Sequence, residues 1–246
     1  RGLENRSLKW ETTDTKNIGL DFGFFNNKLT GAMNYYYNQT EELLITKALP
    51  PSAGLNNPIL NVGKIRNSGV EVEINWADSK GGFDYNIGMN FSTTKNKVVE
   101  LADKGQVLYG EGLKYGTEHF PTQTRVGKPI GAFYLYKTNG LFQSNEEARQ
   151  YVNADGDEYQ PFADAGDIRY VDVNGDGYID DDDKVYCGSG IPTLEVNLNF
   201  SAGYKGFDLS VVLGSAWGHK IYNGNKYFYE GMNSGSNFLT SSLNVW

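Results

Sequence analysis

The chain has 246 residues and a formal net charge of −8, and no stretch of it concentrates its 22 Lys and Arg residues. Nucleic-acid partners need a basic face, so we expect no nucleic-acid binding. A single cysteine, Cys187, excludes an intrachain disulfide framework, and the lack of a run of about 20 apolar residues excludes transmembrane helices but leaves β-strand crossings open.

Tyr, Phe, Asn, Gly and Thr outweigh the strong helix formers, which predicts an all-β protein. The first expected hairpin joins NIGLDFGFF to KLTGAMNYYYN through a turn around Asn26 and Asn27. Apolar residues alternate with small or polar ones in its first strand: Ile18, Leu20, Phe22 and Phe24 against Asn17, Gly19, Asp21 and Gly23.

Two further hairpins follow the same period of two. GVEVEINW and FDYNIGMNFS are joined by DSKGG, and LEVNLNFSAGY and FDLSVVLGS are joined by Lys205 and Gly206 alone. Three hairpins of one kind predict an antiparallel meander. The alternating apolar residues of the second hairpin are Val70, Val72, Ile74 and Trp76, then Phe83, Tyr85, Ile87, Met89 and Phe91.

The connections between hairpins are long, about 39–66, about 97–191 and from His219 onward, whereas the turns inside them are short. This rhythm is typical of an outer-membrane barrel with tight periplasmic turns and long extracellular loops, and strands of about 9 to 13 residues suit a tilted crossing. Aromatic residues flank every short turn, which predicts a periplasmic girdle, and Tyr35, Tyr36 and Tyr37 would begin the outer one.

The number of membrane crossings must be even between the second and third hairpins, and this constrains the least regular region of the sequence. Residues 83–92 must leave a periplasmic turn and residues 194–204 must return to one, so the chain between them crosses the membrane an even number of times. GAFYLYKTNGLF (131–142) therefore cannot be a lone crossing. We expect it to lie in one large extracellular loop, about 97–191, together with a short helix over EEARQYV (146–152).

The loop sequence DVNGDGYIDDDD (172–183) has the spacing of a calcium-binding loop, with Gly177 at the sharp turn. Position 12 departs from that pattern because it holds Asp in place of Glu, and the flanking segments DIRYV and KVYCG look extended, so no helix pair surrounds the loop. We expect one structural calcium ion there, with a solvated acidic turn as the alternative. Its expected ligands are Asp172, Asn174, Asp176, Tyr178 through its carbonyl, Asp180 and Asp183.

Catalytic motifs are missing, and we expect no enzymatic activity. His119 and His219 lie in unrelated loops, and no nucleophile elbow or phosphate-binding glycine loop occurs. Thirty acidic residues leave a glycosidase carboxylate pair open, but no pair is singled out. Glu71, Glu73 and Asp84 could line a polar passage, although a barrel wall needs polar residues there in any case.

Five segments, in this order, resemble the C-terminal half of SusC/RagA-family TonB-dependent transporters. They are LKWETT leading into NIGLDFGFFNNKLTGAMNYYYNQT, IRNSGVEVEINW, VGKPIGAFYLYKTNGLF, GDIRYVDVNGDGYIDDDDKV, and NLNFSAGYKGFDLSVVLGSAWGHKIYN. The resemblance covers nearly the whole chain. One departure is Ser68, where the family more often has a basic residue.

The resemblance implies a large transmembrane barrel in the outer membrane of a Gram-negative bacterium, plugged by an N-terminal domain, energised by TonB and capped by a SusD-type surface lipoprotein. Such transporters import glycans or peptides. On this interpretation residues 1–246 are a C-terminal barrel fragment in contact with outer-membrane lipid, and TonB acts through an N-terminal region outside them. The partner and substrate would meet loop aromatics: Tyr109, Tyr115, Phe133, Tyr134, Tyr136 and Phe142.

Two alternatives from other classes remain at this point. A soluble, calcium-stabilised β-sandwich that binds carbohydrate at the cell surface would show the same alternation. An acidic glycoside hydrolase is the weaker alternative. The sandwich would pack Val70, Val72 and Ile74 against a second sheet, whereas the barrel turns them toward lipid.

Overall fold

The computed structural model describes residues 8–46, 58–110, 120–230 and 237–243. Two structural units divide the chain. Residues 1–132 and 189–220 form the first unit, and residues 133–188 and 221–246 form the second.

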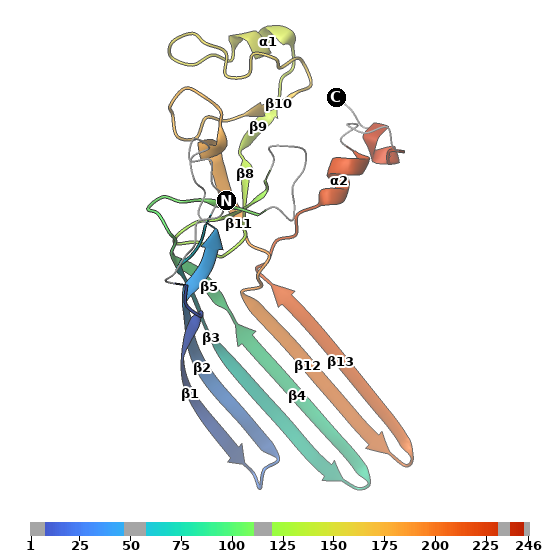
Figure 1. Cartoon of the computed structure of the whole chain (residues 1–246). Coiled ribbons are helices and arrows are strands. Elements are labelled where there is room, and N and C mark those ends of the chain that lie inside the picture. Colours follow the sequence, from blue (N-terminus) through green and yellow to red (C-terminus); the bar gives the residue numbers. More distant parts are fainter. Residues whose placement is uncertain (1–7, 47–57, 111–119, 231–236, 244–246) are drawn as a thin grey trace. The chain divides into compact units, whose positions relative to one another are not determined.

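The first unit is built on a seven-stranded antiparallel sheet (Figure 1). Six strands follow one another in the order β1-β2-β3-β4-β12-β13. β5 pairs with residues 64–68 of β3, on the same side of β3 as β4, which pairs with residues 71–80. β12 pairs directly with β4, so the 100 residues between their ends, 94–193, insert no strand there. The strands are β1 (Thr12–Phe24), β2 (Leu29–Thr46), β3 (Ile59–Lys80), β4 (Phe83–Thr93), β5 (Lys95–Glu100), β12 (Leu194–Tyr204) and β13 (Phe207–Trp217).

The register gives this sheet one apolar and one polar face. On the apolar face, a continuous row crosses all six strands: Phe22, Gly31, Ile74, Met89, Leu198 and Leu213. On the polar face, the adjacent row consists of Asp21, Ala32, Glu73, Asn90, Asn197 and Gly214. The period-2 pattern of the sequence therefore predicted both faces correctly. Val212 is an apolar exception, because its position in the register is on the polar face.

The apolar face is not covered by another layer. Val70, Val72 and Ile74 are only half-buried, and neighbouring side chains such as Leu20 and Met33 are 64% and 49% exposed. The buried apolar residues described in the chain all lie off these rows: Val98, Leu101, Ala132, Phe133, Tyr134, Phe142, Ala148 and Ala163. The packing against a second sheet that a sandwich requires is therefore not found among the described residues.

Tight turns connect β3 to β4 and β12 to β13, as the sequence predicted. Gly81 and Gly82 have φ of 62° and 79°, and Lys205 and Gly206 have φ of 49° and 85°. Both central residues of each turn are left-handed, which is the type I′ geometry that matches the twist of a hairpin. The first turn is wider and takes Phe25, Asn26 and Asn27 through the same region.

Two strands are longer than the sequence indicated. β2 has 18 residues and β3 has 22, so residues 39–46 and 59–66 are strand and not connecting loop. β5 likewise occupies residues 95–100, most of which were assigned to the loop. A bulge interrupts the pairing between Thr40 and Leu43, where Glu42 has φ of 57°. What remains of the expected connection between β2 and β3 is residues 47–57, which lie outside the described residues.

A short hairpin, β6 (Leu108–Tyr109) with β7 (Thr122–Thr124), completes the first unit. In the second unit β8 (Ala132–Tyr136) pairs with β11 (Lys184–Gly188), and β9 (Thr138–Leu141) pairs with β10 (Ile168–Tyr170). Segment 131–142 therefore contributes no strand to the large sheet. The expected helix is α1 (Asn145–Gln150), capped by the Ser144 side chain, and α2 (Gly224–Tyr229) was not anticipated.

A small core holds the second unit together. Phe142, Ala148 and Ala163 are buried in contact with one another, and Tyr151 packs against them.

Across the described part of the chain, no helix is both long and apolar enough to span a bilayer.

Candidate functional site

The polar face of the large sheet is the most extensive candidate surface. Four strands bring amide and carboxylate groups into adjacent rows, because every second residue of each strand points to this side. A hollow of about 200 Å³ lies among them and is lined by Asn34, Glu71, Glu73, Asn90, Ser92 and Asn197. Glu71 and Glu73, which the sequence placed on a polar wall, are thus both in this hollow.

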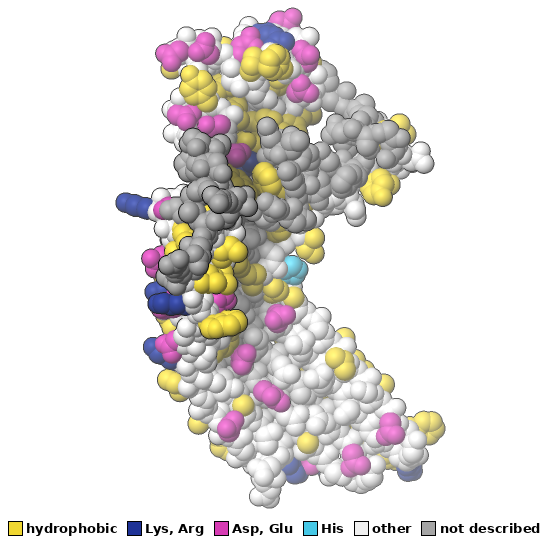
Figure 2. Space-filling view, in the orientation of Figure 1, with side chains coloured by type: hydrophobic (Ala, Val, Ile, Leu, Met, Phe, Trp, Pro, Cys, Tyr) yellow, Lys and Arg dark blue, Asp and Glu magenta, His cyan; other side chains and the backbone are white. Residues whose placement is uncertain are grey.

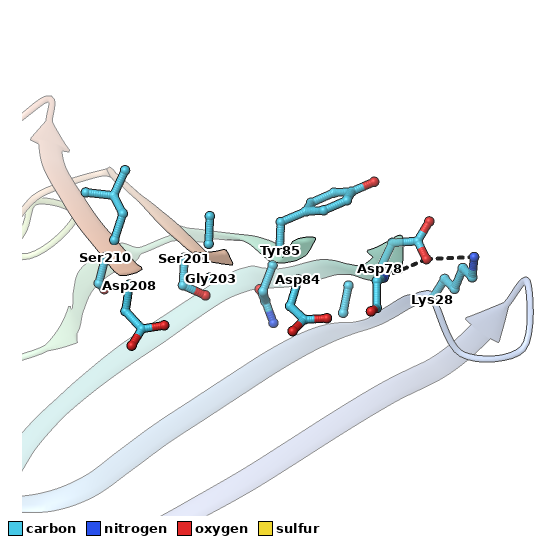
Figure 3. A pocket seen from close by; sticks show the side chains of 13 residues that line it. Lys28, Asp78, Asp84, Tyr85, Ser201, Gly203, Asp208 and Ser210 are labelled. Carbon is cyan, nitrogen blue, oxygen red and sulfur yellow. Dashed lines mark hydrogen bonds and ion pairs between the residues drawn. The ribbon is translucent and has the colours of Figure 1, made fainter. Parts of the chain in front are cut away.

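A second hollow, of about 880 Å³, lies near the short turns. Asp84 and Asp208 point to one side of the sheet, and Tyr85 points to the other (Figure 3). Gly203 lies between the two carboxylates in the register, and a Cβ there would stand 3.0 Å from an Asp208 carboxylate oxygen. Lys28 and Asp78 form an ion pair of 2.7 Å at the rim.

Aromatic side chains mark the turn end of the apolar face. Phe83 contacts both Tyr85 and Tyr204, at ring-centroid distances of 5.7 and 6.3 Å. The Trp76 indole N–H donates to the Tyr85 hydroxyl at 3.2 Å. Three of the turn-flanking aromatics predicted from the sequence, Trp76, Phe83 and Tyr204, are therefore linked by contacts, directly or through Tyr85.

At the far end of the strands, the register corrects one expectation. Tyr35 and Tyr37 lie on the apolar face, but Tyr36 lies on the polar face. Its hydroxyl donates to the Thr93 carbonyl at 3.2 Å, across Gly69, whose missing side chain leaves room for the ring. Three consecutive tyrosines cannot share one face of a strand, so the expected outer girdle contains two of them.

The acidic loop, defined as residues 172–183, is organised by hydrogen bonds from its own backbone. The Asp172 carboxylate accepts from the amides of Gly175 at 2.6 Å and Gly177 at 2.9 Å. Asn174 and Asp176 each accept the amide two residues onward, both within 3.0 Å. These bonds need the left-handed φ of 78° at Gly175 and 93° at Gly177.

Asp183 is the buried anchor of the acidic loop. Its side chain is fully buried, and its two carboxylate oxygens accept amide bonds from Val173, Asn174 and Asp180, the shortest at 2.7 Å. A carboxylate this far from water requires such donors. Asp183 thereby fastens the end of the loop to its beginning.

Neighbouring side chains fix the loop from outside. The Tyr136 hydroxyl donates to Asp181 at 3.2 Å, and the Lys184 ammonium, itself buried, pairs with Asp181 at 2.6 Å. Desolvation and the nearby Asp181 charge raise the pKa of Tyr136 above its usual range, so this phenol stays a donor. Desolvation alone would raise the pKa of Asp172, but the amides of Gly177 and Gly175 outweigh it and lower the net pKa.

The six expected ligand residues therefore lie within one ordered loop, but they do not yet converge on one point. Nowhere among the described residues does a group of three or more His, Cys, Asp or Glu side chains stand ready to hold a metal ion. The donors are all oxygen atoms, which suits a hard divalent cation. The backbone conformation of the loop fits a divalent cation, and the side-chain oxygen atoms would have to move closer together to bind it.

Three aromatic residues expected to meet a partner or substrate are instead structural. Phe133, Tyr134 and Phe142 are 8%, 5% and 0% exposed, so they build the interior of the second unit. Tyr109 is 42% exposed, whereas Tyr115 and His119 lie outside the described residues. The sequence alone could not distinguish aromatic residues that pack in the core from aromatic residues on a contact surface.

Comparison with known families and structures fits these observations. Residues 2–237 match the family model described as TonB dependent receptor-like, beta-barrel. TonB-dependent receptor P3 of Formosa agariphila is 30% identical over 98% of this chain and 24% of its own length. TonB-dependent receptor SusC of Bacteroides thetaiotaomicron is 27% identical over 97% of this chain and 22% of its own length. The chain thus spans about a quarter of the length of these relatives.

Solved structures show the same fold. The structure of the RagAB peptide transporter aligns with a TM-score of 0.71 over 99% of this chain and 25% of that one, at 22% identity. The RagAB peptide importer in its open-open state aligns with a TM-score of 0.70 over 93% of this chain. At this identity the likeness concerns the fold alone.

Proposed function

This chain belongs to the TonB-dependent receptor-like β-barrel family, and we propose that it forms the C-terminal part of the barrel wall of an outer-membrane nutrient transporter in a Gram-negative bacterium. The expected family resemblance to SusC and RagA is confirmed. β1 and β13 each have one strand neighbour among the described residues, so in the complete protein both edges would pair with further strands of the barrel.

The observation that carries this proposal is the length of the uncharged stretch on the apolar face. On β3, the apolar-face positions between Arg66 and Asp78 are Ser68, Val70, Val72, Ile74 and Trp76. Twelve residue steps of strand separate the two charges, about 40 Å along the strand. A tilt of about 40° turns this into roughly 30 Å along the membrane normal, the thickness of the hydrocarbon core.

The opposite face supplies what the inside of a transporter needs. Its carboxylates, amides and hydroxyls, including Glu73, Asn90 and Asn197, would face the lumen and meet hydrated cargo. The cargo we propose is a glycan or a peptide, delivered with a SusD-type lipoprotein and driven by TonB. SusC among the relatives and the RagAB peptide transporter among the structures support this choice.

Growth and uptake measurements test the proposal. Deletion of the complete gene should abolish growth on one class of glycan or peptide in a defined panel, and a plasmid copy should restore it. A plasmid copy with a mutation that uncouples the transporter from TonB should yield protein in the outer-membrane fraction but fail to restore growth. Unchanged growth on the whole panel, or a complete protein found in the soluble fraction, would contradict the proposal.

We also propose that the acidic loop binds one calcium ion, which orders this part of the extracellular region. Oxygen donors at positions 1, 3, 5, 7 and 9 and the left-handed Gly177 at position 6 support it. Asp172, Asp176 and Asp180 would hold the cation with Asn174 and the Tyr178 carbonyl, while Asp183 would close the loop. The ion would offset repulsion among these carboxylates.

Calorimetry on the complete, chelator-treated protein tests the calcium site. Wild type should bind one calcium per chain, and Asp172→Asn with Asp176→Asn should remove that binding. The matched control is Asp155→Asn with Asp157→Asn, two exposed carboxylates of a neighbouring loop that should bind calcium as wild type does. Equal binding by both double variants, or no heat from wild type, would refute the site.

A further inference from the structure

A group of basic side chains lies on the apolar face, just beyond its uncharged rows. Two cross-strand rows follow the last apolar row, in which Ile18, Tyr35 and Val70 are partners. The first contains Lys16, Tyr37, Ser68 and Lys95, and the second contains Asp14, Gln39, Arg66 and Lys97. We call these eight residues the basic rows.

The register makes the basic rows a continuous surface. β5 prolongs the line of β4 beside β3, so Lys95 and Lys97 stand directly across from Ser68 and Arg66. The Cβ atoms of directly opposite residues on neighbouring strands are about 5 Å apart and lie on the same face of the sheet. Their long side chains can therefore reach one another. Dark-blue side chains project from the sheet edge near the level of β5 (Figure 2).

Charge on the basic rows is unbalanced. Four cations stand there with one carboxylate, Asp14, which is 3.4 Å from Lys16. Lys95 and Lys97 are exposed and have no carboxylate partner among the described residues. Farther from the apolar rows, Glu41 is already paired with Lys64 at 3.0 Å. The unneutralised positive charge would attract an anionic group.

Tyr37 holds two of the cations in place. The Arg66 guanidinium and the Lys16 ammonium lie 5.1 and 5.8 Å from the centre of its ring. The Tyr37 hydroxyl and an Arg66 terminal nitrogen both donate to the side-chain amide oxygen of Gln39, Oε1, at 3.0 Å. This network limits side-chain motion, so less conformational entropy is lost when a ligand binds.

The position of the basic rows identifies the kind of ligand. Their first row, at Ser68, lies one row inside the Arg66 end of the uncharged stretch of β3, toward the strand ends opposite the short turns. On the proposed function, on which this inference rests, that level is the headgroup region of the outer leaflet. Basic side chains beside lipid-facing aromatics at that level recognise phosphorylated headgroups.

We propose that the basic rows bind the phosphate groups of a lipid in the outer leaflet. Arg66 and Lys16 would form a fixed pair of donors beside Tyr37, and Lys95 and Lys97 would reach the same headgroup from β5. The acyl chains would lie along Tyr35, Val70 and the apolar rows below. The site would seat the barrel against the outer leaflet at a fixed depth.

Lipid binding by the complete protein in nanodiscs tests this proposal. The probe is lipid A with two phosphates, compared with lipid A with one phosphate and with dephosphorylated lipid A, by native mass spectrometry. Lys95→Gln with Lys97→Gln should weaken diphosphorylated lipid binding about 30-fold, since each basic residue near a membrane surface contributes about 1 kcal/mol. The matched control, Lys80→Gln with Lys205→Gln, removes two exposed lysines from the turn end and should bind as wild type does.

Other outcomes would overturn the inference. Equal binding of all three lipids, or of both double variants, would show that the basic rows do not recognise lipid phosphate. Displacement by millimolar inorganic phosphate would identify a free anion as the ligand. If Lys95→Gln with Lys97→Gln lost the lipoprotein partner but still bound lipid as wild type does, the basic rows would be a protein interface and not a lipid site. A protein that forms no heat-modifiable barrel in lipid would instead refute the proposed function itself.

Discussion

The ring of Phe22 on β1 lies over Gly31, its direct cross-strand partner on β2. A Cβ added to Gly31 would overlap that ring and stand 2.7 Å from the Glu73 carbonyl oxygen of β3. The glycine is therefore required for three strands to approach one another closely. The aromatic ring covers the gap that the glycine leaves in the apolar face.

Gly31→Val should lower the free energy of unfolding of the complete barrel by about 1–3 kcal/mol, because the added side chain displaces Phe22. Urea unfolding in liposomes, followed by the shift in gel mobility, would measure the change. Thr30→Val is the control, since it conserves volume on the opposite face. An equal stability of Gly31→Val and wild type would contradict the contact.

The Lys205–Gly206 turn gives a second prediction. Gly206→Val should cost about 1–2 kcal/mol and slow barrel assembly, since a β-branched residue resists φ of 85°. Lys205→Asn should fold at least as well as wild type, because asparagine tolerates the left-handed region. Refolding yield into liposomes would compare the two variants, and similar yields would argue against a type I′ turn.

Charge placed on neighbouring residues of β3 should have opposite consequences. Ile74→Lys puts an ammonium on the apolar face near the middle of the uncharged stretch and should cost about 2–4 kcal/mol. Asn75→Lys puts the same charge on the polar face and should leave stability nearly unchanged. The same urea titration measures both, and similar losses would remove the distinction between the faces.

Asp183 gives a prediction for the acidic loop without added calcium. Asp183→Ala leaves three backbone amides without their acceptor and should lower the local stability of the loop by about 1–3 kcal/mol. Hydrogen exchange at Val173, Asn174 and Asp180 should accelerate accordingly. Exposed Asp182→Asn is the control, and unchanged exchange in Asp183→Ala would show that the buried carboxylate is dispensable.

The sequence predicted the faces of the sheet well because only one side of each strand meets an apolar environment. Val72 and Glu73, for example, are assigned correctly by alternation alone. The extension of β2 beyond Gln39 was missed for the converse reason. Outside the uncharged stretch neither side of the strand must be apolar. Residues such as Thr40 and Glu41 therefore pair with β1 as strand without any period-2 signal in the sequence.

The candidate sites were predicted less completely. Glycine spacing indicated the path of the acidic loop, and Gly175 and Gly177 have the left-handed φ it needs. The burial of Asp183 depends on its contact with Val173 and Asn174, which no local pattern encodes. The basic rows were missed because Lys16, Arg66 and Lys95 are far apart in the chain and become neighbours only through the register of three strand pairs.

Cysteine labelling along β3 tests the central claim most directly. In the complete protein with Cys187→Ser as background, single cysteines at Val70, Glu71, Val72, Glu73 and Ile74 would be exposed in cells to a water-soluble maleimide. The two-faced barrel wall predicts labelling at 71 and 73 and protection at 70, 72 and 74, with the protected sites reacting once lipid is replaced by denaturant. Equal labelling at all five positions would contradict a wall with lipid on one side and water on the other.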